Sequence, residues 1–122
     1  MRSIFLLLLS ALSLPLLPAG ARAEEGMTMF MRNQNDRAIV VEFHGRTTGA
    51  VWPGKGQIYL LDGKEKKSVT LGCVEGERIC YGAWVNGNDR QSFGVGPDDD
   101  RDCDDCCRTC VGGTTETVDI GG

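Results

Sequence analysis

Residues 79–95 read I-C-Y-G-A-W-V-N-G-N-D-R-Q-S-F-G-V, with Asn86-Gly87 between two strand-like runs. Asn-Gly between such runs is the strongest short-range signal of a two-residue β-hairpin, and these loops favour type I′ turns. A type I′ turn needs positive φ at both central residues, which Gly adopts freely and Asn tolerates. The stretch therefore predicts an antiparallel hairpin with a type I′ turn at Asn86-Gly87.

The same alternation with a period of two continues on the N-terminal side of this hairpin. In the run from Ala38 to His44, Ile39, Val41 and Phe43 share one face, whereas Glu42 and His44 share the other. Such alternation is typical of a strand with one buried face. About seven short strands are expected in all: 27–31, 38–44, 58–61, 68–71, 79–85, 90–95 and 117–120. They predict a mainly β domain, a small antiparallel sandwich or barrel.

The N-terminal residues follow the pattern of an export signal. Arg2 precedes an apolar stretch that Pro18 and Gly20 interrupt, and Ala21-Arg22-Ala23 forms an A-x-A cleavage site. We expect residues 1–23 to be a cleaved signal peptide and residues 24–122 to be one exported domain in the periplasm or outside the cell. The apolar stretch is shorter than the roughly 20 residues that a membrane-spanning helix needs. No membrane insertion is expected after cleavage.

The charge balance argues against two classes of partner. The chain carries 13 basic and 17 acidic residues, and cleavage would remove Arg2 and Arg22 and leave 11 basic residues. Nucleic acid and anionic lipid both need a basic face on the protein that binds them. We therefore expect neither of them as a partner.

One segment near the C-terminus departs from the alternation. Residues 97–113 are rich in Asp and Cys, and the four cysteines of C-x2-C-C-x2-C fall at i, i+3, i+4 and i+7, on one face of a helix. Pro97 suits a first helical position and Gly112 suits a cap, but Asp and Cys are poor helix formers. The segment is expected to be either a short helix or an irregular loop.

The cysteines are the main candidates for structural bridges. An even number of cysteines in an exported chain indicates disulfides first, and the alternative is a soft-metal site for zinc or copper built from the cluster of four. On a helix, Cys103 and Cys110 would be about 10 Å apart along the axis, too far for one tetrahedral ion. We favour disulfides, and the candidates are Cys73, Cys80, Cys103, Cys106, Cys107 and Cys110.

The pairing of these cysteines stays open at this point. Adjacent Cys106 and Cys107 are not expected to pair with each other. Cys73 and Cys80 flank a short turn and would either bridge locally or anchor the Asp/Cys segment to the sheet. The second arrangement closes longer loops and stabilises more in the chain-entropy model.

Two other groups would suit metal ions. Met27, Met29 and Met31 point to one side of an extended chain and, with His44, would suit monovalent copper, but the simpler interpretation is three core methionines. The aspartates at 98–100, 102, 104 and 105 suggest calcium. The segment does not match an EF-hand loop that starts at Asp98, because Cys103 occupies the glycine position and Thr109 occupies the closing glutamate position. No metal or other cofactor is favoured, and calcium is kept as an alternative.

Catalytic patterns find little support in this sequence. The only histidine is His44, and the chain has neither a G-x-S-x-G elbow nor a phosphate-binding loop. The aromatic residues Trp52, Trp84, Tyr59 and Tyr81 would form a binding surface or pack the sandwich, and packing is expected for Trp84 and Tyr81.

Four motifs carry a resemblance. They are Trp52-Pro53-Gly54, Cys80-Tyr81-Gly82-Ala83-Trp84, Gly94-Val95-Gly96 and the C-x2-C-C-x2-C cluster at 103–110. This pattern resembles a small group of exported bacterial proteins of unknown function and covers most of the chain after the signal. The resemblance implies an exported single domain and supplies no activity. Thaumatin-like proteins are similar in general plan only.

Three function classes follow from these observations. The first is an exported, disulfide-stabilised, non-catalytic domain that binds a protein or a glycan. The alternative is a soft-metal protein that binds copper or zinc through the cysteine cluster or the N-terminal methionines. The third is a small secreted toxin or enzyme.

Overall fold

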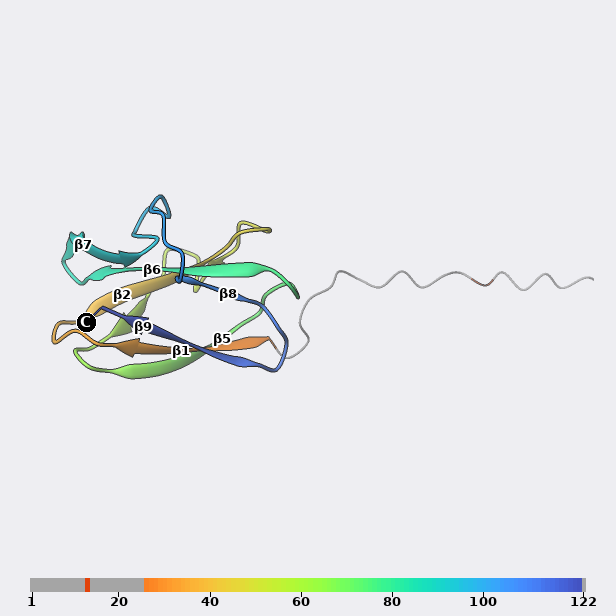
Figure 1. The fold of residues 1–122 in the computed structure, drawn as a ribbon, viewed down its shortest axis with the longest axis horizontal. Coiled ribbons are helices and arrows are strands. Elements are labelled where there is room, and N and C mark those ends of the chain that lie inside the picture. Colours follow the sequence, from red (N-terminus) through yellow and green to blue (C-terminus); the bar gives the residue numbers. More distant parts are fainter. Residues whose placement is uncertain (1–12, 14–25, 122) are drawn as a thin grey trace, which may run out of the picture.

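The computed structural model describes Ser13 and residues 26–121. The predicted signal peptide therefore lies, apart from Ser13, outside the described residues. The described chain is built from strands arranged in two layers, without a helix (Figure 1). None of it forms a helix that is long and apolar enough to cross a membrane.

The smaller layer is a three-stranded sheet of order β5-β1-β9. Its central strand β1 (Met27–Asn33) pairs antiparallel with β5 (Lys66–Leu71) and parallel with β9 (Thr115–Ile120). The first and last strands of the domain thus lie side by side (Figure 1). This parallel pair differs from the wholly antiparallel arrangement that the sequence suggests. The two strands lie more than 80 residues apart, so no hairpin connects them directly.

The larger layer is a six-stranded sheet around β2 (Ile39–Gly45) and β6 (Arg78–Val85). One edge of β2 carries both β3 (Val51–Trp52) and β4 (Tyr59–Leu61). The free edge of β6 is shared in the same way by β7 (Asn88–Gly94) and β8 (Cys107–Thr109). The two sheets together form a small mainly β sandwich, so the predicted fold class is confirmed.

The core lies between the two sheets and is lined by alternate residues of each strand. Met27, Met29 and Met31 of β1 are at most 1% exposed and belong to it. The other sheet contributes Ile39, Val41 and Phe43 of β2. The alternation thus identifies the inner faces of both strands, because side chains of a strand point to opposite sides in turn. Three methionines on a core strand agree with the simpler interpretation of that run.

The β6–β7 hairpin forms as expected, but its turn is of a different type. Val85 pairs with Asn88, so Asn86-Gly87 is the two-residue loop. Gly87 has a φ of 83°, whereas Asn86 is not among the residues with positive φ. Type I′ is therefore wrong, since positive φ at the second central residue alone is the pattern of a type II turn. A register shift follows: Trp84 pairs with Ser92 and leaves residues 89–91 without partners on β6.

The Asp/Cys segment is a loop and not a helix. It passes through turns and bends from residue 95 to residue 106 and then forms the short strand β8. Its aspartates and cysteines have low helix propensity, and disulfides decide its path instead. Together with β3, β8 brings the number of strands to nine, two more than the alternation predicts.

All six cysteines are paired in three disulfides, Cys73–Cys110, Cys80–Cys107 and Cys103–Cys106. Cys73 and Cys80 therefore both anchor the C-terminal segment to the rest of the domain and do not bridge each other. Cys80 and Cys107 face each other across the β6–β8 ladder with their Cα atoms 4.0 Å apart. Three bridges are typical of proteins that fold in an oxidising compartment.

Candidate ligand-binding site

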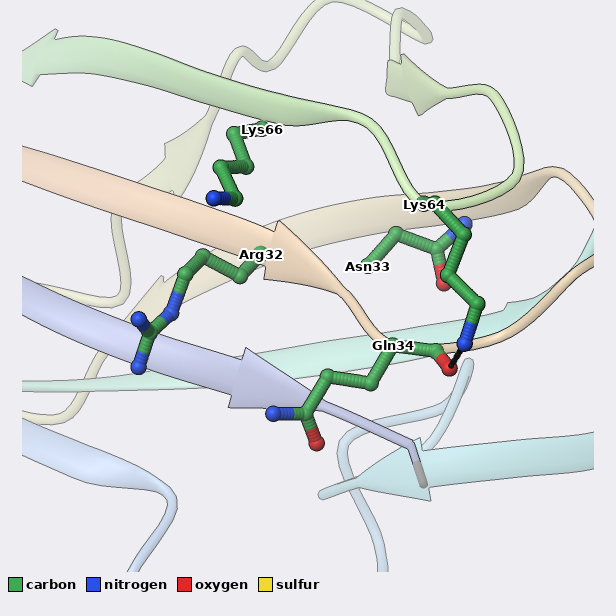
Figure 2. Close-up of a pocket in the computed structure, with 5 residues that line it drawn as sticks. All are labelled: Arg32, Asn33, Gln34, Lys64 and Lys66. Atoms are coloured by element: carbon green, nitrogen blue, oxygen red, sulfur yellow. Dashed lines mark hydrogen bonds between the residues drawn. The ribbon is translucent and has the colours of Figure 1, made fainter.

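A pocket of about 560 Å³ lies where β1 ends and β5 begins (Figure 2). Strand β1 supplies two of its lining residues, and the others come from the loop after β1, from the turn before β5 and from β5 itself. The lining residues are Arg32, Asn33, Gln34, Lys64 and Lys66. Every one of these side chains is polar, and three of them carry a positive charge.

Strand register brings the two strand cations together. Arg32 lies directly opposite Lys66 in the β1–β5 ladder and opposite Asp119 in the β1–β9 ladder. Directly opposed residues share one face of a sheet, here the face turned away from the core. A cation on β5 therefore stands beside the Arg32–Asp119 pair on the outer surface of the smaller sheet.

Arg32 is held by a two-pronged ion pair. Its Nε and Nη2 donate to the two carboxylate oxygens of Asp119, and Nη2 lies 2.7 Å from Oδ2. The hydrogen bond from Arg32 is the main reason that the pKa of Asp119 lies below its ordinary value, and it also raises the pKa of Arg32. Such a fork fixes the guanidinium geometrically and leaves it charged.

Lys64 is held at the opposite side of the pocket. It has a φ of 63°, and its ammonium donates to the backbone carbonyl of Gln34 at 2.6 Å, the dashed line in Figure 2. Asp36 lies 3.6 Å from the same nitrogen. For Lys66, by contrast, no ion pair is found within the described chain, although Figure 2 shows its side chain on the side of the pocket where Arg32 lies.

Asn33 fixes the two loops that form the rim. Its side chain is buried, and its amide nitrogen donates to the carbonyls of Arg37 at 2.8 Å and Asp62 at 2.9 Å. Its side-chain oxygen accepts from the backbone N–H of Asn35 at 2.9 Å. A buried amide whose nitrogen and oxygen both form hydrogen bonds holds the backbone of the neighbouring loops in one arrangement. The pocket is therefore preformed on its buried side.

The arrangement is suited to holding an anion. Lysine ammonium and arginine guanidinium groups are the usual partners of carboxylate, sulfate and phosphate groups. None of the lining residues forms a nucleophile–base pair, the arrangement that covalent catalysis requires. The lining residues can bind and orient a ligand through their charges and hydrogen bonds.

The sequence alone did not predict this pocket. The run Lys64-Glu65-Lys66-Lys67 was a visible signal of local positive charge. What gathers the cations is the pairing of β5 with β1, two strands more than 30 residues apart, and a single sequence does not reveal that register.

His44 lies far from the methionines with which it was grouped. It is on the outer face of β2, whereas the methionines belong to the core beneath the other sheet. Its Nε2 lies 3.9 Å from a carboxylate oxygen of Glu42, and its Nδ1 lies 3.9 Å from one of Asp99. The described residues therefore do not assemble the proposed copper site of three thioethers and one imidazole.

The aspartates of the Asp/Cys segment are dispersed along its loop. Asp99 is half-buried and accepts a hydrogen bond from Arg46 at 2.7 Å, which holds the loop against the larger sheet. The side chains of the other five are exposed: Asp98, Asp100, Asp102, Asp104 and Asp105. In the described chain no three carboxylates converge at the distances typical of a metal site.

The cysteine cluster offers a single metal-like grouping. Among the described residues, only Cys103, Asp105 and Cys106 bring three potential ligand atoms within 4.8 Å of one another. Both sulfurs of this group are joined in the Cys103–Cys106 disulfide. Thiolates are what zinc and monovalent copper bind, so this oxidised form lacks the ligands of the soft-metal alternative.

The aromatic residues divide between the two faces of the larger sheet. Tyr81 is 9% exposed and lies in the core, Trp52 and Tyr59 pack against its edge, and Tyr59 is in ring contact with Phe43. Trp84 is half-buried and pairs with Val40 on the outer face. The expectation that Trp84 packs the sandwich is wrong, because an even-numbered residue of β6 cannot share the inner face with Tyr81.

Comparison of the chain with models of protein families, with curated proteins and with solved structures finds no match in any of the three.

Proposed function

We propose that this chain is an exported, disulfide-stabilised, non-catalytic domain that binds a ligand carrying an anionic group in the pocket between β1 and β5. The observation that carries the proposal is the convergence of Arg32, Lys64 and Lys66 on one pocket of a chain with a formal net charge of −4. Asp119 and Asp36 offset part of the charge of Arg32 and Lys64, so Lys66 leaves the pocket with a positive charge that a bound anion would compensate. A protein or an acidic glycan presenting a carboxylate, sulfate or phosphate would match it.

Export is part of the same proposal. Three disulfides and the signal-like residues 1–23 both support a location in the periplasm or outside the cell. The chain isolated from its native compartment should begin at Glu24. Intact-mass analysis that finds Met1 retained on the exported protein would contradict this start.

The binding test uses the oxidised chain from residue 24 and three probes: inorganic phosphate, sulfate and galacturonate. Calorimetric titration should find saturable binding of at least one probe, and added salt should weaken it by screening. Lys66→Ala should weaken binding about tenfold or more, because it removes the pocket cation that forms no ion pair among the described residues.

The matched control is Arg78→Ala. Arg78 is an exposed cation at the start of β6 on the other sheet, so its loss changes the net charge equally. Affinity should stay within about twofold of the parent in this variant, because nonspecific charge effects are small at a distance. An equal loss of affinity in both variants, or no binding of any probe, would refute the proposal that this pocket binds an anion.

A further inference from the structure

The hairpin between β6 and β7 forms a second hollow on the other sheet. It measures about 310 Å³ and is lined by Trp84, Gly87, Asn88 and Asp89. Its position follows from the register shift, because Val85 pairs with Asn88 while Trp84 pairs with Ser92. The extra residues 89–91 leave the ladder beside the indole. A bulge of this kind often redirects side chains at a binding site.

An apolar row on the outer face leads to this hollow. Leu60, Val40 and Trp84 lie opposite one another on β4, β2 and β6. Leu60 is 40% exposed, Val40 is buried, and Trp84 is half-buried. The edge of the hollow is thus an aromatic ring that continues an apolar strip, although it lies on the solvent side of the sheet. Aromatic residues placed in this way are typical of binding surfaces.

The remaining walls of the hollow are polar. Asp89 and Asn88 are exposed on β7, and no ion pair involves Asp89 within the described chain. The Asn88 side-chain oxygen accepts from the backbone N–H of Arg90 at 3.3 Å, which leaves its amide hydrogens for a ligand. Gly87 presents no side chain, and a Cβ at that position would meet nothing within 4 Å. A ligand can therefore approach the turn backbone closely.

From this combination we infer that the hollow binds an uncharged sugar ring. A pyranose has an apolar face of C–H groups that stacks on an indole, and hydroxyls at its edge. A carboxylate accepts two hydroxyl hydrogen bonds, and an amide both donates and accepts. The pairing of one aromatic platform with a few convergent polar groups is what such small sites require. The Asp89 carboxylate repels acidic sugars, so the ligand differs from that of the basic pocket.

The test uses the oxidised chain from residue 24 and the methyl glycosides of glucose, galactose, mannose and N-acetylglucosamine. The chain has two tryptophans, so Trp52→Phe assigns the indole N–H resonance of Trp84. At least one glycoside at millimolar concentration should shift that resonance saturably. Trp84→Ala, followed through the backbone amide of Asn88, and Asp89→Ala should each weaken binding about tenfold or more.

Three variants serve as matched controls. Trp52→Phe alters the other tryptophan, Asp98→Ala removes an exposed carboxylate of the Asp/Cys segment, and Lys66→Ala alters the basic pocket. Each should bind the glycoside as the parent does. Trp84→Ala should retain anion binding, so the sugar site and the basic pocket are tested independently of each other. The inference is overturned if no glycoside shifts the Trp84 resonance or if binding survives Trp84→Ala. It is also overturned if the hollow binds tetramethylammonium, a cation that an indole ring and a carboxylate both attract, and does not bind the glycosides.

Discussion

At the scale of single residues, the buried carboxylate of Glu77 shows how one side chain holds a loop. Glu77 is 2% exposed, and its Oε2 accepts the backbone N–H groups of Thr47 at 3.1 Å and Thr48 at 2.6 Å. Burial opposes its ionisation, but the hydrogen bonds led by Thr48 outweigh burial, so the pKa of Glu77 lies below its ordinary value. A charged acceptor of this kind stabilises the turn that follows β2.

Acid should remove this contribution. A carboxyl with a folded pKa below its unfolded pKa stabilises above the unfolded pKa, near 4.5, and loses that effect as pH falls through the folded pKa. Glu77→Gln should therefore cost about 2 kcal/mol in the free energy of unfolding at pH 7, and this difference should shrink by pH 3. Urea denaturation at both pH values measures it. The exposed Glu75, changed to Gln, should alter stability little, and a pH-independent cost of Glu77→Gln would contradict the account.

The Asn86-Gly87 turn depends on the backbone freedom of one glycine. Gly87 has a φ of 83° with open space where a Cβ would lie, so conformational strain is the only obstacle to a side chain there. Gly87→Val should destabilise the domain by about 1 kcal/mol or more. The control is Gly72→Val, since Gly72 is equally unobstructed and its φ is not positive. Chemical denaturation with equal midpoints for the two variants would show that the turn is misplaced.

The burial of single residues could be predicted where side chains alternate along a strand. It identified the inner-facing positions of β1 and β2, because a period of two fixes which side chains share a face. The expectation for Trp84 rested on its place in a strand-like run and not on the alternation, which separates Trp84 from Tyr81 in β6. The same alternation places Trp84 on the outer face, where it lines the proposed sugar site.

At the scale of elements, the seven predicted strands all occur, and two short ones were missed. Strand β3 has two residues and β8 has three, and neither lies in a four-residue apolar run like the one that marks β4. Pairing was the part that the sequence did not reveal. The contact of β1 with β9 and that of β1 with β5 are both long-range, so the basic pocket that depends on them was not predicted.

The three disulfides should differ in how much they stabilise these elements. Cys73–Cys110 and Cys80–Cys107 span 37 and 27 residues, whereas Cys103–Cys106 spans 3. In the chain-entropy model, the two long bridges contribute about 3.5–4 kcal/mol each and the short one about 1.5 kcal/mol. Replacing each pair by alanines and measuring unfolding in urea should give that order. A larger loss from the Cys103/Cys106 double variant than from the other two would contradict it.

At the scale of the whole molecule, the disulfides and the two pockets have separate roles. Residues 97–107 of the Asp/Cys segment are held to the larger sheet by Cys80–Cys107 and by the Arg46–Asp99 contact. Its exposed aspartates repel one another, and it contributes little apolar surface. The basic pocket and the Trp84 hollow lie on different sheets and use none of the cysteines. Binding at the two proposed sites should therefore depend on the bridges only through the stability of the fold.

The central claim is that the cysteines are structural bridges of an exported binding domain and not ligands of a soft metal. Thermal melting of the chain from residue 24, once with reductant and once with chelator, tests it most directly. In the same chain-entropy model the three bridges together contribute about 9 kcal/mol, against about 5–15 kcal/mol for a domain of ordinary stability, so removing them should leave the chain at or beyond the edge of folding. The account predicts that reductant abolishes the transition or lowers it steeply and that chelator leaves it in place. An unchanged melting temperature in reductant together with a lowered one in chelator would contradict the account and favour the metal protein.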